Sequence, residues 1–310
     1  MPIEQAIHTK GKLLLTGEYA VLDGALALGL PTKLGQWLRV KPLSEGSRHQ
    51  WRSLLPDGTP WFEATLSSGG TLLSATHQQA GKRLEALLAS VEAQRPGFWS
   101  HQPLLQFETQ LEFEREWGLG SSSTLVAGLA RWAGIDPFEL LRGTFGGSGY
   151  DIACALANKP VLFQRHQQKP AYVEIPYAPA FSSHICFAYL GQKQDSRAGI
   201  KAYRERGGAA PAEIRETSAL TLAFLQARTA GEAILALEAH ESLMSKILGQ
   251  PTVQLNLFPN FPGVVKSLGA WGGDFVMAIS DRPVEAIRQY FRVKGYPVTF
   301  AFDELAAYSG

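Results

Sequence analysis

Hydrophobic and polar residues alternate from position 106 to position 114. Phe107, Thr109, Leu111 and Phe113 share one side of this segment, and glutamine and glutamate residues occupy the other side. Successive side chains of a β-strand point to opposite faces, so a period of two predicts a strand with one buried face and one exposed face.

A second segment, residues 74–94, has a helical period. Leu84, Leu87, Leu88 and Val91 recur at spacings of three and four, which predicts an amphipathic helix. Similar patterns elsewhere predict further strands at 12–16, 36–40, 161–164, 185–190, 275–280 and 298–302, and helices at 125–133, 211–228, 231–248 and 283–293.

Three prolines indicate where the chain divides. Pro170, Pro176 and Pro179 fall within ten residues and predict a crossover between two domains. A chain of 310 residues has room for two domains of ordinary size. We therefore predict an α/β fold with one domain at residues 1–175 and a second at residues 176–310. Because strands and helices follow one another in the second half, we expect a layered α/β sandwich there.

Composition excludes several classes of protein. Hydrophobic residues make up 45% of the chain, which is enough for a large core, and 29 basic residues face 28 acidic ones for a net charge of +1. This balance argues against a nucleic-acid partner. No apolar run approaches the length of a membrane span, the first residues lack the pattern of a signal peptide, and Cys154 and Cys186 define neither a metal site nor a disulfide scaffold. We expect a cytoplasmic protein without a nucleic-acid or membrane partner.

A glycine-rich turn, residues 118–123, lies directly between the alternating strand and an apolar helical run. Such a turn exposes backbone N–H groups at the positive end of the helix dipole, a geometry that binds phosphate. The same residues also fit a plain turn with a serine N-cap. The spacing of the glycines is neither that of a P-loop nor that of a dinucleotide-binding fold.

Three further positions are candidates for chemistry. Lys12 precedes an apolar strand, where a lysine can hold phosphate or simply face water. Asp151 follows a glycine turn, where a carboxylate can accept a proton or cap the next helix. The segment 266–274 has three glycines in five positions, which suit close approach to a ligand as well as a tight turn.

Taken in order, four segments resemble the motifs of the GHMP kinases, the family of galactokinase, homoserine kinase, mevalonate kinase and phosphomevalonate kinase. These segments are 11–24 (GKLLLTGEYAVLDG), 118–123 (GLGSSS), 147–153 (GSGYDIA) and 266–273 (KSLGAWGG). The resemblance spans almost the whole chain. It implies an N-terminal α/β domain, a ferredoxin-like C-terminal domain, and an ATP-dependent kinase that acts on a small molecule and uses Mg²⁺.

The resemblance also implies roles for individual residues. Lys12 would stabilise developing charge, Asp151 would take or orient the acceptor proton, and Ser122 would bind Mg²⁺. Glu139, which lies at a suitable distance before Asp151, would complete the metal site. The phosphate loop would consist of Gly118, Leu119, Gly120, Ser121, Ser122 and Ser123, and the C-terminal glycine motif of Gly269, Ala270, Gly272 and Gly273.

Within the family, the first motif is most similar to the mevalonate branch, and Tyr19 resembles phosphomevalonate kinase more than mevalonate kinase. Mevalonate or phosphomevalonate is therefore the expected acceptor. Its expected contacts are Glu18, Tyr19, Lys193, Ser196 and Arg197. Two alternatives stay open, namely a diphosphomevalonate decarboxylase and a catalytically silent nucleotide-binding protein of the same fold. A homodimer also stays open.

Two positions depart from the family's pattern. Trp271 and Asp274 stand where a glycine and a small residue are usual in the C-terminal glycine motif.

Overall fold

The computed structural model describes residues 4–167, 169–192 and 196–307, with no description of the side chains at 196 and 197. Its residue contacts divide the chain into two compact units. The first unit holds the chain up to Gly11, Leu34–Arg115 and Gly120–Leu156, and the second holds Lys12–Lys33, Glu116–Leu119 and the chain from Ala157 onward. The units therefore do not follow a single cut of the chain, and the predicted boundary at residue 175 stays a prediction.

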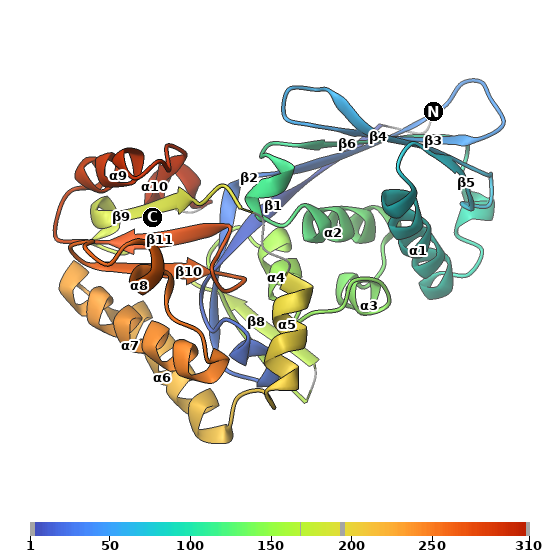
Figure 1. The fold of residues 1–310 in the computed structure, drawn as a ribbon. Coiled ribbons are helices and arrows are strands. Elements are labelled where there is room, and N and C mark those ends of the chain that lie inside the picture. The colour runs from blue at the N-terminus through green and yellow to red at the C-terminus, as the bar shows by residue number, and fades with distance from the viewer. Residues whose placement is uncertain (1–3, 168, 193–195, 308–310) are drawn as a thin grey trace. The chain divides into compact units, whose positions relative to one another are not determined.

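The first unit is a sheet covered by helices (Figure 1). Its strands pair in the order β5-β4-β3-β6-β2, and β3 and β6 are parallel. The strands that contribute to it are β1 (Gln5–Thr16), β2 (Ala27–Pro42), β3 (His49–Leu54), β4 (Pro60–Leu66), β5 (Leu72–Ala75) and β6 (Leu105–Leu111). Its helices are α1 (Gln78–Gln94), α2 (Ser121–Ala133), α3 (Pro137–Arg142) and α4 (Tyr150–Leu156).

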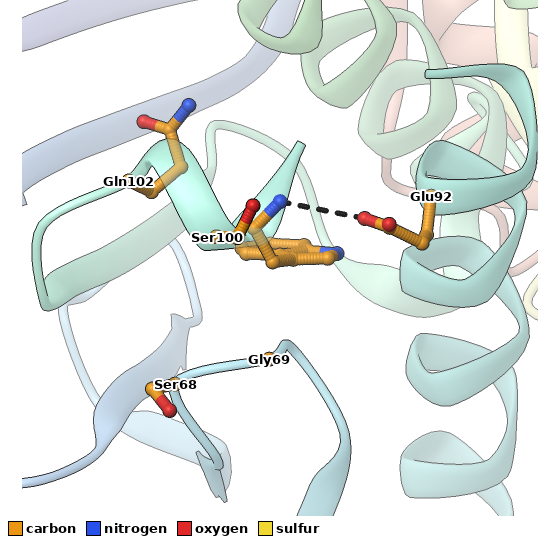
Figure 2. A pocket seen from close by; sticks show the side chains of 6 residues that line it. Ser68, Gly69, Glu92, Ser100 and Gln102 are labelled. Carbon is orange, nitrogen blue, oxygen red and sulfur yellow. Dashed lines mark hydrogen bonds between the residues drawn. The ribbon is translucent and has the colours of Figure 1, made fainter. Parts of the chain in front are cut away.

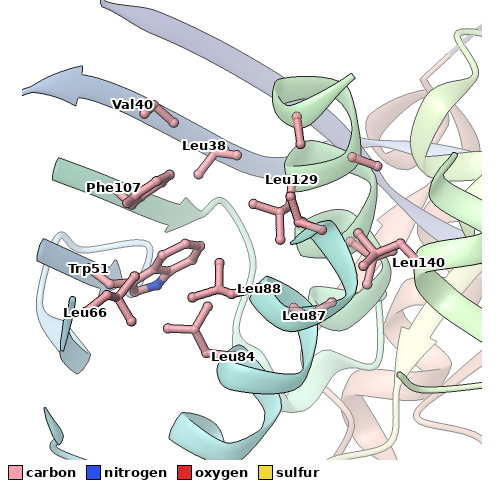
Figure 3. Packing of buried hydrophobic residues seen from close by; sticks show 14 of the residues in the cluster. Leu38, Val40, Trp51, Leu66, Leu84, Leu87, Leu88, Phe107, Leu129 and Leu140 are labelled. Carbon is pink, nitrogen blue, oxygen red and sulfur yellow. The ribbon is translucent and has the colours of Figure 1, made fainter. Parts of the chain in front are cut away.

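The core of this unit lies between the sheet and its helices, as Figure 3 shows. Leu38 and Phe107 point from the strands toward Leu84 and Leu88 of α1 and toward Leu129 of α2. All five side chains are buried. The alternation along residues 106–114 and the helical spacing along residues 74–94 are thus confirmed as the buried faces of β6 and α1, with β6 ending at Leu111.

The second unit contains a four-stranded antiparallel sheet in the order β10-β11-β9-β12. Helices α8 and α9 pack on one face of this sheet, and α7 contacts β10 and β11. The strands are β7 (Val161–His166), β8 (Lys169–Glu174), β9 (Ile185–Tyr189), β10 (Val264–Leu268), β11 (Phe275–Ile279) and β12 (Thr299–Ala301). The helices are α5 (Ser196–Glu205), α6 (Pro211–Gln226), α7 (Ala230–Leu248), α8 (Val253–Leu257), α9 (Val284–Val293) and α10 (Phe302–Leu305).

The expected mixed α/β fold is confirmed, and two predicted elements need correction. Residues 74–75 belong to strand β5, so the helix begins at Gln78. Residues 170–174 belong to strand β8 rather than to a crossover. Pro170 is tolerated there because β8 lies at the edge of its sheet, where a missing N–H breaks no ladder. Among the described residues, no helix is long and apolar enough to cross a membrane.

Candidate functional site

The predicted phosphate loop ends at the N-terminus of α2. Gly120 occupies the N-cap with a left-handed backbone (φ 96°) and, as a glycine, has no side chain with which to cap the helix. The first N–H groups of an α-helix have no intrahelical acceptor, so they face an incoming anion. Ser123 is buried and donates its hydroxyl to the carbonyl of Gly120 (2.9 Å), whereas Ser122 is exposed. Ser123 therefore shapes the turn, and Ser122 lies at the surface.

Lys12 lies against the first half of this loop. Its Nζ donates to the carbonyl of Gly118 at 2.8 Å, and its backbone N–H donates to the carbonyl of Leu119 at 2.9 Å. Two segments that are more than 100 residues apart in sequence are thus joined by two hydrogen bonds. The structure brings together two of the predicted groups, the Lys12 ammonium and the start of the glycine loop.

Asp274 is a second neighbour of the loop, and the sequence assigned it no role. A Cβ atom built on Gly118 would lie 1.8 Å from Oδ2 of Asp274, so only glycine fits at position 118. Burial raises the pKa of Tyr189, and the charges of Asp274 and Glu116 act in the same direction. The only signal in the sequence was that an acidic residue ends the C-terminal glycine motif.

Asp151 lies in the first turn of α4 and is half-buried. Its Oδ1 accepts the N–H of Ile152 at 3.1 Å, a local contact close to that of a capping residue. Helix α4 packs against α2, whose first turn carries Ser122. A catalytic role for Asp151 stays a prediction.

Glu139, whose role as a metal ligand stays a prediction, has a partner within its own helix. It lies in α3, where Asp136 caps the helix by accepting the N–H of Phe138 at 2.8 Å. The Glu139 carboxylate is partly exposed and pairs with Arg142 one turn later. Across the described residues, no group of three or more His, Cys, Asp or Glu side chains is arranged to hold a metal ion.

Glu18 is completely buried in a charged cluster rather than exposed to solvent. Lys266 of β10 donates to Glu18 at 2.5 Å, to Glu241 of α7 at 3.3 Å and to the carbonyl of Ser267 at 2.9 Å. Neighbouring residues of a strand face opposite sides, so Lys266 points toward α7 while Val265 points toward α8 and α9. We call Glu18, His240, Glu241 and Lys266 the buried charge cluster.

Burial controls the protonation of this cluster. Burial raises the pKa of Glu241 to about 7 and raises that of Glu18, although the charge of Lys266 acts in the opposite direction on both. The pKa of His240 is held well below its usual value, first by burial and then by Lys266. Nε2 of the neutral His240 ring accepts the N–H of Gly17 at 2.9 Å. The cluster thus connects the first motif to the strand that carries the glycine motif.

Tyr19 and the remaining predicted acceptor contacts have different surroundings. The Tyr19 hydroxyl accepts the backbone N–H of Trp271 at 2.9 Å, in the turn that contains Gly269, Ala270, Gly272 and Gly273. That turn is closed by a bond from the N–H of Gly273 to the carbonyl of Ala270. Lys193 lies outside the described residues, and Ser196 and Arg197 begin α5 without described side chains. Contacts from Glu18, Tyr19 or these three residues to an acceptor stay predictions.

A cavity of about 400 Å³ lies elsewhere in the first unit (Figure 2). Trp99 and Glu92 both line it, and Glu92 accepts the backbone N–H of Trp99 at 3.4 Å. Arg95, which follows α1, donates to the carbonyl of Ala133 in the last turn of α2. Trp99 also packs against Trp132 in the last turn of α2, with ring centroids 5.8 Å apart, so the cavity lies near the end of α2 opposite Ser122. The lining residues are Ser68, Gly69, Glu92, Trp99, Ser100 and Gln102.

Comparison by sequence gives no match to a family model or to a curated protein. Comparison by structure gives matches over nearly the full chain. Phosphomevalonate kinase from Streptococcus pneumoniae, in complex with phosphomevalonate and AMPPNP, is 17% identical with a TM-score of 0.72, and the match covers 96% of this chain and 99% of that one. L. major mevalonate kinase in complex with R-mevalonate is 15% identical with a TM-score of 0.64, covering 96% and 94%. Lactococcus lactis galactokinase complexed with galactose is 11% identical with a TM-score of 0.63, covering 96% and 92%. The chain therefore has the GHMP kinase fold that its four motifs predict.

Proposed function

We propose that the protein is an ATP-dependent kinase that transfers the γ-phosphoryl group to a small acceptor, with mevalonate or phosphomevalonate as the favoured acceptor. The observation that carries this proposal is the hydrogen bond from Lys12 to Gly118, at the start of a glycine-rich loop that leads into α2. The fold agrees with it, since phosphomevalonate kinase and mevalonate kinase are among the similar structures.

The triphosphate would be held by the first turn of α2. Phosphoryl transfer depends mainly on positioning and on neutralising charge, so backbone N–H groups that point at the phosphates supply much of what is needed. Gly120 at the N-cap leaves this approach open because it has no side chain. The exposed hydroxyl of Ser122 suits a Mg²⁺ ligand. When bound, the ion would neutralise charge on the phosphate oxygens.

Lys12 and Asp151 would act on the acceptor and on the transferred group. Lys12 would place its positive charge where negative charge develops on the phosphoryl oxygens. With a hydroxyl acceptor, Asp151 would take the hydroxyl proton as the oxygen bonds to the γ-phosphorus and the bond to ADP breaks. Glu139 is the weaker candidate for the metal because Arg142 already neutralises it.

The acceptor itself would be recognised by the segment that leads into α5. Lys193, Ser196 and Arg197 supply two positive charges and a hydroxyl, which suits an acceptor that already carries phosphate. Glu18 is already paired with Lys266, so we propose that Glu18 stabilises the first motif through this buried ion pair.

The decisive experiment measures ADP release with a panel of acceptors: mevalonate, phosphomevalonate, galactose and homoserine. Turnover with one acceptor that is lost in Lys12→Met supports the kinase. If the protein instead releases CO₂ from diphosphomevalonate, it is a diphosphomevalonate decarboxylase and the kinase proposal is wrong. If it binds ATP tightly but turns over no acceptor, it is a catalytically silent nucleotide-binding protein.

The phosphomevalonate assignment has its own test. A charge-assisted hydrogen bond contributes about 1.5–3 kcal/mol, and about 1.4 kcal/mol corresponds to a factor of ten. Arg197→Ala or Lys193→Ala should therefore raise the KM for phosphomevalonate by roughly 10–150-fold and leave the KM for ATP unchanged. Mevalonate is the control without phosphate. If both variants bind phosphomevalonate as the parent does, the assignment of phosphomevalonate as the acceptor is wrong.

A further inference from the structure

Tyr19 contacts two segments that are far from it in sequence. Its hydroxyl accepts the N–H of Trp271 in the glycine-rich turn at 2.9 Å. A Cβ atom built on Gly199 would lie 2.4 Å from the same hydroxyl oxygen, so the backbone of α5 rests directly against it. One oxygen atom therefore touches both α5 and the turn between β10 and β11.

The Tyr19 side chain has little freedom to move away from these contacts. Its backbone has φ 54°, which is uncommon for a residue other than glycine and tends to occur at functional sites. The ring is buried and packs on the ring of Tyr203 at 5.6 Å. Burial raises the pKa of Tyr19, so the hydroxyl stays neutral and available for hydrogen bonding.

Both contacted segments are anchored at a second point as well. Tyr203 of α5 donates to the carboxylate of Asp23, which also accepts the N–H of Ala209 at 3.2 Å. The indole N–H of Trp271 donates to the carbonyl of Pro251 at 3.0 Å. Asp23 is itself part of the first motif, but the Tyr19 hydroxyl is an atom of that motif that contacts both the helix and the turn.

We propose that Tyr19 is a positioning residue whose hydroxyl fixes α5 and the glycine-rich turn in one arrangement. Since α5 begins at Ser196 and Arg197, this arrangement determines where the acceptor-binding segment begins. The inference rests on the proposed function for its effect on the acceptor. The contact itself is tested independently of activity.

The main variant is Tyr19→Phe, which removes only the hydroxyl. Without its acceptor, the Trp271 N–H should exchange with solvent at least about tenfold faster, as measured by hydrogen exchange of a peptide covering residues 269–273. The KM for the acceptor should rise about tenfold while the KM for ATP stays within twofold. A role in stability alone would lower the melting temperature without separating the two KM values.

Tyr177→Phe is the matched control. Tyr177 is a buried tyrosine of the same unit, and its hydroxyl has no hydrogen-bond partner among the described residues. This variant should change neither the exchange of residues 269–273 nor the ratio of the two KM values.

A double-mutant cycle with Gly199→Ala tests the second contact. The new methyl group meets the hydroxyl at 2.4 Å in the parent, but the nearest ring carbons only at 3.2 Å once the hydroxyl is gone. Gly199→Ala should therefore raise the acceptor KM by tenfold or more in the parent and by less than threefold in Tyr19→Phe. If Gly199→Ala does not fold, exchange in Tyr19→Phe decides the inference.

Unchanged exchange at residues 269–273 in Tyr19→Phe, or equal effects of Gly199→Ala in both backgrounds, would overturn the inference. Failure of the proposed function looks different, because the parent would then be inactive on every acceptor while exchange still responded to Tyr19→Phe.

Discussion

Lys266→Met should destabilise the protein severely, because Lys266 is the positive charge that two buried carboxylates share. Its Nζ lies 2.5 Å from Glu18 and 3.3 Å from Glu241, and the lysine is 0% exposed. Methionine has nearly the same length and hydrophobic volume, so the substitution removes the charge and leaves little cavity. What remains is a pair of carboxylates without a counter-charge.

Removing one partner from a buried ion pair typically costs about 3–5 kcal/mol. Because burial raises the pKa of Glu241 to about 7 and also raises that of Glu18, protonation already removes part of the uncompensated charge at pH 7, so the lower half of that range is expected there. Whole proteins are stable by about 5–15 kcal/mol, so the loss is a large fraction of the total. The loss should shrink as the pH falls toward 5, because burial raises the pKa of both carboxyls and protonation then removes the uncompensated charge.

Urea unfolding followed by circular dichroism measures this loss from the midpoint and the slope. Lys246→Met is the matched control, since that lysine is exposed on α7 and lies 3.9 Å from Glu213, a surface pair that contributes about 1 kcal/mol at most. A loss below about 1 kcal/mol for Lys266→Met, or a loss equal to that of the control, would refute the view that the cluster is a compensated charge network.

Three further predictions concern single functional groups. Glu241→Gln removes a carboxyl whose pKa burial raises from 4.5 to about 7, so the parent should lose stability relative to this variant as the pH rises through that window; urea unfolding at several pH values measures it. Asp151→Asn should keep the fold and ATP binding but lower kcat by roughly 10²–10⁴-fold, and turnover within threefold of the parent would remove Asp151 from the chemistry. Ser122→Ala should weaken binding of Mg²⁺-ATP, measured by calorimetry, far more than binding of metal-free ATP. Equal losses would make Ser122 an ordinary loop residue.

Local patterns explain which parts of the fold were predictable. The alternation around Phe107 involves residues of a single strand, and the helical spacing around Leu88 involves residues within about two turns of one helix. Both predictions are confirmed. The prediction of a crossover at Pro170 was wrong because proline disfavours most strand positions but not an edge position. Whether a strand is at an edge depends on which strands pair, and this information is not local.

In the candidate site, too, features that depend on neighbouring residues were predicted, and features that depend on distant contacts were not. The glycine loop was found because its residues are adjacent, and Lys12 was found because it stands in a recognisable motif. Asp274 was noticed only as an unusual residue, since its contact with Gly118 joins positions more than 150 residues apart. The buried charge cluster was missed for a further reason. Charged residues are mostly exposed in proteins, and the ion pair with Glu18 is what offsets the free-energy cost of burying Lys266 completely.

Glu18 and Tyr19 show what the structure adds to a motif that was found in the sequence. The predicted contacts of both side chains with an acceptor stay a prediction, and the structure shows that both side chains contact the segment 266–273. Glu18 binds Lys266 in the strand before the turn, and Tyr19 binds Trp271 within it. Two consecutive residues thus hold the turn at its base and at its tip. If this turn contacts a phosphate, its geometry depends on the first motif, so a substitution at Glu18 or Tyr19 should change ligand binding without either side chain touching the ligand.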